Sequence, residues 1–213
     1  MLVRDVMTKN VITVSSNTSL GDAKKVMKEN NISRLPVLEN GKLIGIVNED
    51  RLESVSASRA MAPVPWQVFY LLSKTTVKDV MVKDVVTVSP DATAEESVAL
   101  AQRRGVGALV VVEDGKVVGI VTTTDLFNGI VNRVLGIGRP GTRLIIPKAG
   151  EGDDVEKILN VINQQGIEVI TMFTISLPRS RRKEFIIHLG ASDVSAVVQK
   201  LKELGYQPQV RSR

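Results

Sequence analysis

Apolar and polar positions follow one order in the first part of the chain. A short apolar run at 11–14 is followed by Ser, Asn and Thr residues and then by apolar residues at helical spacing between 20 and 27. An apolar stretch next turns at Asn40-Gly41, a pair that favours a two-residue hairpin because both positions adopt positive φ. The pattern predicts a strand, a helix, a hairpin and a second helix that begins near Arg51.

The same order recurs 74 residues later. Three segments, 3–7, 11–15 and 40–47, reappear as 77–81, 85–89 and 114–121. One offset shared by three segments is not expected by chance, and two copies are too few for a solenoid. The sequence therefore predicts a duplicated β-α-β-β-α unit whose two copies pack against each other.

The pattern changes after a Gly- and Pro-containing segment at 136–141, which is typical of a linker. The strands expected beyond it are 142–147, 167–177, 184–189 and 206–210, and the helices are 153–165 and 193–204. This order, β-α-β-β-α-β, is that of a ferredoxin-like plait. The fold class is therefore α/β (α+β).

One stretch, 119–125, combines a strand end with candidate binding chemistry. Thr122, Thr124 and Asp125 stand where the strand passes into a helix, and either threonine could cap that helix. A helix N-terminus favours an anion, and a carboxylate can accept hydrogen bonds from both hydroxyls of a ribose. The alternative interpretation is a capped turn that binds nothing.

The composition is that of a globular protein and argues against membrane-spanning and disulfide-bonded classes. The chain has 213 residues, of which 43% are hydrophobic and 24% charged, as is ordinary for a globular protein. No apolar run approaches the roughly 18 residues of a spanning helix, and the N-terminus lacks a signal-peptide pattern. A cytoplasmic protein without membrane contact is expected. The absence of cysteine excludes disulfides and thiolate zinc sites.

The charge and the single histidine argue against a nucleic-acid-binding protein and against an enzyme. The net charge of +5 is diffuse, and aromatic residues make up only 3% of the chain, so stacking on nucleic acid is disfavoured. The single histidine, His188, lies in an expected strand without a second ligand or a nucleophile, and a structural role is favoured. No catalytic residue, no metal site and no enzymatic activity are therefore predicted. A basic turn at 179–183 is interpreted as solvated, with a phosphate contact as the alternative.

Residues 1–135 resemble a tandem pair of cystathionine-β-synthase (CBS) domains. The motifs that carry the resemblance are Asp5-Val6-Met7, Asp79-Val80-Met81, Arg34-Leu35-Pro36-Val37, and the Gly119, Thr122 and Asp125 of the closing motif. The resemblance implies a regulatory module that binds an adenosine-containing ligand (AMP, ADP, ATP or S-adenosylmethionine) and controls an unidentified partner protein by conformational change.

The resemblance also assigns site residues. Asp125 would hold the ribose, Thr122 the ribose or α-phosphate, and Arg34 of the other repeat the phosphates. The expected adenine-lining residues are Val82, Val85, Ala108, Leu109 and Ile120.

The symmetry-related site departs from the family pattern. Asn48 and Arg51 stand where the motif has Ser or Thr and Asp, and Ala108 stands where Arg34 would have its counterpart. One nucleotide per chain is therefore predicted. Asp50 could replace the missing carboxylate only after a register shift of one residue, which would turn its side chain to another face.

The C-terminal part resembles an ACT domain in its predicted architecture, and pairing with a second copy of the chain is its expected role. The combination resembles bacterial acetoin-utilisation accessory proteins. The insertion at 53–76, which holds Trp66, is either packed against the first repeat or part of a dimer contact. A dimeric scaffold or a nucleic-acid-associated regulator is the alternative function. The expected domains are 1–74 and 75–135 (CBS repeats), 136–141 (linker) and 142–213 (ACT-like).

Overall fold

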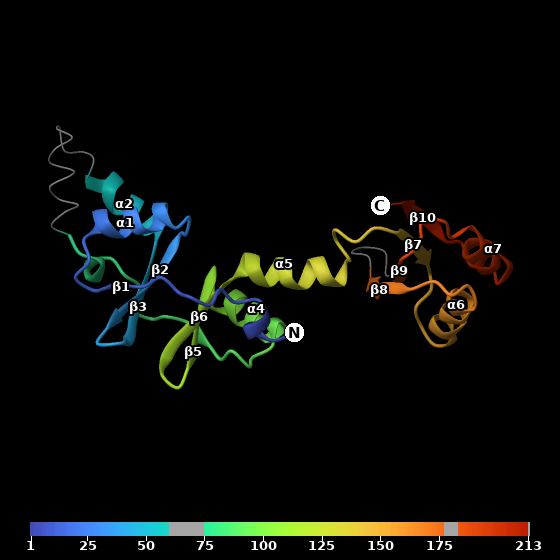
Figure 1. Ribbon diagram of the computed structural model, residues 1–213, viewed down its shortest axis with the longest axis horizontal. Coiled ribbons are helices and arrows are strands. Elements are labelled where there is room, and N and C mark those ends of the chain that lie inside the picture. Colours follow the sequence, from blue (N-terminus) through green and yellow to red (C-terminus); the bar gives the residue numbers. More distant parts are fainter. Residues whose placement is uncertain (60–74, 177–182, 213) are drawn as a thin grey trace. The chain divides into compact units, whose positions relative to one another are not determined.

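A computed structural model describes residues 1–59, 75–176 and 183–212 (Figure 1). The chain divides into two compact units, Met1–Leu126 and Phe127–Arg213. Trp66 and most of its insertion, like most of the basic turn at 179–183, lie outside the described residues. The expectations for those two segments therefore stay predictions.

The duplicated element order fills the first unit, and its last helix extends past Leu126. The first copy comprises η1 (Val3–Asp5), β1 (Val14–Ser15), α1 (Leu20–Glu29), β2 (Arg34–Glu39), β3 (Lys42–Asn48) and α2 (Glu49–Arg59). The second comprises η2 (Val77–Asp79), β4 (Thr87–Val88), α4 (Ala94–Arg104), β5 (Ala108–Glu113), β6 (Lys116–Thr122) and α5 (Thr123–Val134). Each copy builds a three-stranded sheet, with orders β1-β2-β3 and β4-β5-β6. The predicted β-α-β-β-α repeat is confirmed.

The turns and helix starts have local causes. Asn40 and Gly41 join β2 to β3 with φ values of 49° and 76°, the positive values that this two-residue turn requires. Asp114 and Gly115 repeat the turn with φ values of 49° and 75°. Helix α1 begins after Ser19, whose hydroxyl accepts a 3.0 Å hydrogen bond from the backbone N–H of Asp22.

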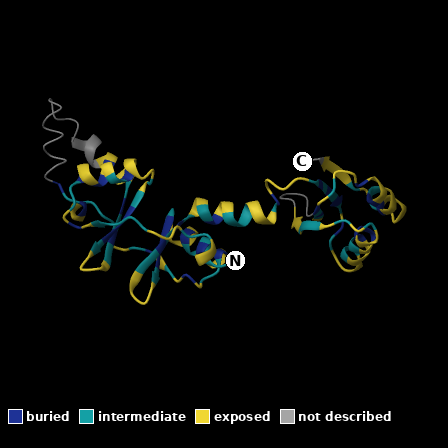
Figure 2. Cartoon of the chain, viewed as in Figure 1, coloured by how far each residue is buried: buried dark blue, intermediate teal, exposed yellow. Residues whose placement is uncertain are grey.

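Apolar side chains of helices and strands form the core of the first repeat. Figure 2 marks buried residues in dark blue along the chain. The buried members of this core are Leu20, Ala23, Met27, Leu35, Val37, Val47, Leu52 and Val77. Val77 lies in the segment that precedes β4, so the second copy contributes to the core of the first.

This contribution is reciprocal. We call residues 1–8 the N-terminal arm and residues 75–82 the inter-repeat arm. The N–H of Val3 donates to the carbonyl of Ala92 at 2.9 Å, and the N–H of Val77 donates to that of Thr18 at 2.8 Å. Each arm therefore binds the body of the other repeat, with the same 74-residue offset on both sides of each contact.

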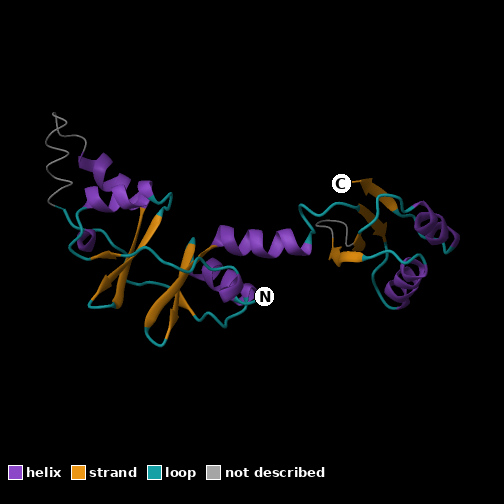
Figure 3. Ribbon diagram, viewed as in Figure 1, coloured by secondary structure: helices purple, strands orange, loops and turns teal. Residues whose placement is uncertain are grey.

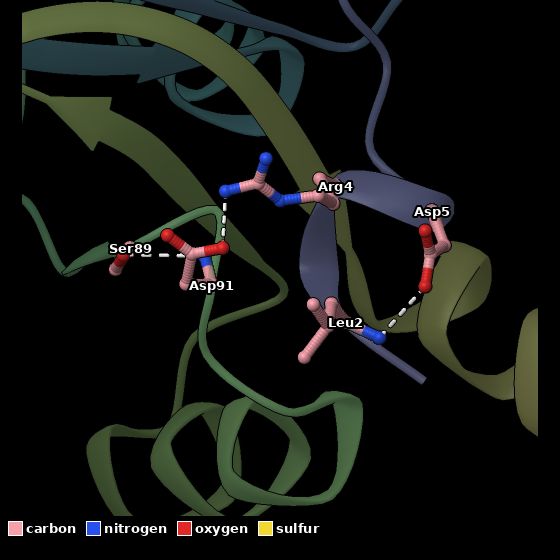
Figure 4. Close-up of polar contacts among 5 residues, drawn as sticks. All are labelled: Leu2, Arg4, Asp5, Ser89 and Asp91. Carbon is pink, nitrogen blue, oxygen red and sulfur yellow. Dashed lines mark hydrogen bonds and ion pairs between the residues drawn. The ribbon is translucent and has the colours of Figure 1, made fainter.

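Side chains support the N-terminal arm (Figure 4). Arg4 forms an ion pair with Asp91, and the N–H of Asp91 donates to Ser89 Oγ at 3.2 Å. The N–H of Leu2 donates to Asp5 Oδ2 at 2.9 Å. Because the Arg4–Asp91 pair is well exposed, we expect it to contribute less than about 1 kcal/mol. Most of the docking energy must come from backbone bonds and burial.

A methionine of each arm packs on a glycine of the facing strand. A Cβ added at Gly119 would lie 2.5 Å from the sulfur of Met7, and one added at Gly45 would lie 2.5 Å from that of Met81. A larger residue at either glycine would force the methionine to shift. The Asp-Val-Met and glycine motifs of the sequence are thus two halves of one packing contact.

The second unit is a four-stranded sheet with two helices. Its elements are β7 (Thr142–Pro147), α6 (Asp153–Gln164), β8 (Val169–Ser176), β9 (Lys183–Leu189), α7 (Ser195–Glu203) and β10 (Gln209–Ser212). The strand order is β10-β7-β9-β8, and all three pairs are antiparallel. This is the predicted ferredoxin-like arrangement. The assignment to ACT domains stays a prediction.

Alternate residues of β7 and β9 pack against both helices of this unit, which lie on one side of the sheet (Figure 3). The core includes Leu144, Ile146, Ile158, Ile162, Phe185, Ile187, Val197 and Leu201. His188 is 1% exposed. The segment expected to be a linker lies against it, because a Cβ at Gly136 would stand 2.5 Å from His188 Nδ1. The local contacts favour a packing role for this histidine.

A tyrosine fixes the first turn of α6. The hydroxyl of Tyr206 donates to Asp154 Oδ1 at 2.7 Å. Burial, the hydrogen bond and the charge of Asp154 together raise the pKa of Tyr206 to about 12. The neutral phenol is therefore favoured by the folded state, and its contribution to stability is complete below pH 10 or so and lost as the pH rises towards 12.

Replacing Tyr206 by phenylalanine should lower the free energy of unfolding by about 1 kcal/mol, the net value of a typical hydrogen bond. The difference between the two proteins should shrink between about pH 10 and 12 as the wild-type phenol ionises. Urea unfolding of both proteins at pH 8 and at pH 11 measures this, and the comparison cancels the titration of lysines. A difference that does not depend on pH would contradict the assignment.

Candidate functional site

The end of β6 carries a reciprocal cap. Asp125 Oδ2 accepts hydrogen bonds from Thr122 N at 2.9 Å and from Thr122 Oγ1 at 2.7 Å. Thr122 Oγ1 in turn accepts from Asp125 N at 3.1 Å. Thr122, and not Thr124, is therefore the cap of α5. A carboxylate can accept about four hydrogen bonds, so Asp125 keeps capacity for further donors such as ribose hydroxyls.

The N-terminal arm lies beside this cap. Thr8 N donates to the carbonyl of Ile120 at 2.9 Å, and Ile120 N donates to that of Thr8 at 3.0 Å. Residues from both repeats therefore meet at the end of β6. We use the name Asp125 cleft for the group formed by Thr8, Ile120, Thr122 and Asp125, without an observed cavity.

A cavity of about 230 Å³ lies at the symmetry-related place. It too combines residues of both repeats, because Ile46 and Val82 exchange backbone hydrogen bonds of 2.9 and 2.8 Å. Its lining residues are Arg34, Ile46, Asn48, Val82, Asp84, Val85, Val86, Gly105, Val106, Gly107 and Ala108. We call this the Asn48 cavity.

Arg34 reaches across the two repeats within this cavity. Its Nη1 donates to Ser33 Oγ at 3.1 Å, and a Cβ added at Gly107 would lie only 2.8 Å from its Nη2. The guanidinium therefore lies against the backbone of the second repeat. At the rim, Arg104 Nη2 and Asp84 Oδ2 form an ion pair of 2.7 Å. The cavity thus offers a cation next to apolar walls.

The cap of α2 at the Asn48 cavity differs from the cap of α5. Asn48 Oδ1 accepts from Arg51 N at 3.2 Å, which reproduces the role of Thr122. The Arg51 side chain donates to the carbonyl of Val80 at 3.2 Å, so a cation replaces the carboxylate. The strand register is unchanged, because Arg34 opposes Asn48 as Ala108 opposes Thr122. The register shift that would have brought Asp50 into the site is therefore wrong.

The structure distributes the eight predicted residues over more than one place, and their joint binding of one ligand stays a prediction. Arg34, Val82, Val85 and Ala108 line the Asn48 cavity, whereas Ile120, Thr122 and Asp125 lie with Thr8. Leu109 is fully buried and belongs to the core. The physical reason is the reciprocal docking of the arms. The inter-repeat arm binds beside β3 of the first repeat, so its residues serve the cavity of that repeat.

The sequence did contain a signal for the residues that were missed. Subtracting the 74-residue offset from Val82 and Val85 gives Thr8 and Val11. Thr8 is the residue that pairs with Ile120. If the 74-residue offset is applied to every predicted site residue, and not only to the motifs, the residues of the Asp125 cleft are distinguished from those of the Asn48 cavity.

Two absences apply to residues 1–59, 75–176 and 183–212. No group of three or more His, Cys, Asp or Glu side chains in this part is placed to hold a metal ion. Among the same residues, no helix combines the length and the apolar character needed to cross a bilayer.

Comparisons with known proteins concern the duplicated part of the chain. The family model of the CBS domain matches residues 3–57 and 77–132. An inosine-5'-monophosphate dehydrogenase of Korarchaeum cryptofilum is 35% identical over 120 residues, which are 56% of this chain and 22% of that enzyme. The chain thus covers less than a quarter of this relative, and the match lies in the CBS region.

Two solved structures are similar. The CBS domain pair of protein MJ0100, solved with 5'-methylthioadenosine and S-adenosylmethionine, has a TM-score of 0.51 at 29% identity and covers 59% of this chain and 96% of its own. A Vibrio cholerae protein named for acetoin utilization has a TM-score of 0.51 at 32% identity, covering 62% and 91%. The family match spans about half of the chain, in both copies of the repeat. The chain belongs to the CBS domain family and carries a tandem pair of these domains.

Proposed function

We propose that this protein is a regulatory module that binds one adenosine-containing ligand per chain, in the Asp125 cleft. The observation that carries the proposal is the reciprocal Thr122–Asp125 cap, which orients a carboxylate at a strand end where both repeats meet. Such a carboxylate can accept both hydroxyls of a ribose, which are two donors at a fixed spacing. The complex of MJ0100 with two adenosyl ligands supports this ligand class.

The proposed pose uses the offset between the repeats. Ile120 would contact the adenine from one side, and Thr8 and Val11 would replace Val82 and Val85 on the other. The N-terminus of α5 would face any phosphate, since its N–H groups and dipole favour an anion. Arg34 lines the Asn48 cavity, so the proposal does not depend on it for phosphate binding.

The Asn48 cavity is proposed not to hold the same ligand. Arg51 replaces the ribose carboxylate there, and a guanidinium donates hydrogen bonds but accepts none. Two ribose hydroxyls facing Arg51 would meet a donor in place of an acceptor. One ligand per chain follows from this difference.

Regulation would follow from the arms. A ligand in the Asp125 cleft contacts β6 and the N-terminal arm together, so it stabilises the arrangement in which that arm is docked. A ligand shifts a conformational equilibrium only by its difference in affinity for the two states. We propose that a partner protein senses the docked state, and we assign no catalytic step to the site. Asp125, the acidic residue of the cleft, is needed for the ribose.

A thermal-shift titration of the full chain with AMP, ADP, ATP, S-adenosylmethionine, 5'-methylthioadenosine and NAD tests the ligand class. A ligand at 100 times its Kd should stabilise the folded state by about 2.7 kcal/mol. Equilibrium dialysis should then give one ligand per chain. If none of the six compounds shifts the transition, the proposal is wrong.

The two clefts can be distinguished by a matched pair of variants. Val11 and Val85 are separated by the 74-residue offset, and both are half-buried. Val11→Ala should weaken the ligand that shifts the transition, and Val85→Ala should not. The opposite result would place the ligand in the Asn48 cavity.

A further inference from the structure

The two arms touch their glycines through the methionine atom that oxidants attack. Met7 Sδ lies only 2.5 Å from the position that a Cβ of Gly119 would occupy. Met81 Sδ lies at the same distance from the corresponding position of Gly45, and the 74-residue offset relates the two contacts. Oxidation of the thioether sulfur turns an apolar side chain into a polar one. Each arm therefore has an oxidisable atom in direct contact with a strand of the facing repeat.

The methionines of the arms are accessible in the folded chain. Met7 and Met81 are half-buried, whereas Met27 is 2% exposed in the core of the first repeat. The chain contains no cysteine, so no thiol competes for an oxidant. Because susceptibility follows exposure, we expect a peroxide to oxidise the two arm methionines of the folded protein before it reaches Met27.

A backbone pair next to each methionine makes a sulfoxide unfavourable there. In the N-terminal arm, Thr8 and Ile120 exchange hydrogen bonds of 2.9 and 3.0 Å, so both N–H groups already have acceptors. The carbonyl oxygen of Thr8 lies 3.2 Å from the Cβ position of Gly119. A sulfoxide oxygen on this side would meet an acceptor, and a polar atom buried without a donor is costly. In the inter-repeat arm, Val82 and Ile46 form the equivalent pair. Oxidation should therefore favour departure of the arm from the strand.

We propose that Met7 and Met81 are oxidation sites whose sulfoxides release the ends of the two arms from β6 and β3. The sulfur attacks one oxygen of a peroxide, the O–O bond breaks, and an S–O bond forms. The sulfur is oxidised by two electrons, and hydrogen peroxide is reduced to water. Methionine sulfoxide reductases can reverse the modification. Release would separate Thr8 from its partner in the Asp125 cleft and Val82 from its partner in the Asn48 cavity.

The beginning of each arm is expected to stay in place. Val3 and Val77 are 0% exposed, and their N–H groups donate to the carbonyls of Ala92 and Thr18. Burial of these two side chains does not involve the methionine sulfur, so it continues to stabilise the docked segments after oxidation. The expected change is thus a local opening of each arm and not the unfolding of a repeat.

Hydrogen exchange followed by NMR tests the proposal residue by residue in the full chain. Hydrogen peroxide is added to the folded protein, and mass spectrometry measures the sulfoxide content of each methionine. Once Met7 and Met81 are fully oxidised, the amides of both backbone pairs should exchange about tenfold or more faster, while those of Val3 and Val77 keep their rates. Reductases for both sulfoxide epimers should restore slow exchange. The measurement needs no ligand, so its outcome does not depend on the proposed adenosine site.

Matched variants distinguish the two arms. Met7→Leu and Met81→Leu keep an apolar side chain of similar volume but cannot form a sulfoxide. After peroxide treatment, Met7→Leu should protect only the Thr8–Ile120 pair, and Met81→Leu only the pair of the other arm. Met172→Leu removes a 49% exposed methionine of the second unit and should leave the response of the wild type unchanged.

Four results would overturn the proposal. The first is unchanged exchange at both pairs after complete oxidation of Met7 and Met81. The second is oxidation of these two residues no faster than that of Met27. The third is an equal acceleration in the wild type and in the double leucine variant, which would assign the effect to another methionine. The fourth is a matching loss of protection at Val3 and Val77, which would indicate unfolding. Circular dichroism checks the fold of each variant, and the reductase experiment uses the wild type alone.

Discussion

Replacing Leu109 by alanine is expected to lower the free energy of unfolding of the first unit by about 2–5 kcal/mol, the range for a fully buried leucine. Leu109 is 0% exposed and is the second residue of β5, opposite Val121 of β6, so its truncation would leave a cavity that the surrounding strands can fill only in part. The resemblance to CBS domains implies that Leu109 lines the adenine. The structure makes it a core residue whose loss affects folding first.

Calorimetry of the full chain measures this effect, because two compact units can unfold in separate transitions. Ile187→Ala, a truncation in the core of the second unit, identifies the transition that does not belong to the CBS pair. Ala108, the neighbour of Leu109, lines the Asn48 cavity. Because it is already alanine, it cannot be truncated in the same way as Leu109. A loss below about 1 kcal/mol for Leu109→Ala would mean that the site collapses without a cavity.

Asp125→Ala is expected to weaken the adenosine ligand tenfold or more. A hydrogen bond to a charged group contributes about 1.5 to 3 kcal/mol, and each 1.4 kcal/mol is a factor of ten in Kd. Isothermal titration with the compound that gives the largest thermal shift measures the change. The variant also loses a helix cap, which by itself costs about 1 kcal/mol of stability. Affinity and stability must therefore be measured separately.

Glu96→Ala is the matched control for the lost cap. Glu96 accepts from Thr93 N and Thr93 Oγ1, both at 3.0 Å, as Asp125 accepts from Thr122. These bonds, the backbone one first, lower the pKa of the Glu96 carboxyl. The control should lose stability and keep the affinity of the wild type. If Asp125→Ala and the wild type bind the adenosine ligand with equal affinity, Asp125 does not bind the ribose.

The repeat and its turns could be predicted because their causes are local. Asn40-Gly41 and Asp114-Gly115 define their hairpins by two residues each, and the positive φ values follow. Thr122 and Asp125 form a cap from residues three apart in sequence, so the pattern of residue types was sufficient. The strand order of the second unit followed from its element order, because few topologies connect those elements without crossing.

The residues that line each cleft could not be predicted from the local sequence pattern. Thr8 pairs with Ile120 over more than a hundred residues, and no local preference distinguishes that partner from its counterpart Ile46. Arg34 was expected near the phosphates of the Asp125 ligand, yet it lines the Asn48 cavity. Which arm docks on which repeat decides whether a residue belongs to the Asp125 cleft or to the Asn48 cavity. That docking depends on packing between segments that are distant in sequence.

The reciprocal arms set the order in which the chain can fold during synthesis. The backbone of Val3 bonds to that of Ala92, and the backbone of Thr18 can accept its hydrogen bond only after Val77 has been made. At 5 to 20 residues per second, a ribosome needs on the order of 5 to 20 s to make the roughly 90 residues that separate the first arm from its partner. The core of the first repeat is uncovered for a shorter time, until Val77 has been made. The N-terminal arm has no partner until the second repeat is made, and a nascent chain stalled before Val77 would expose core residues of the first repeat to aggregation or to a chaperone.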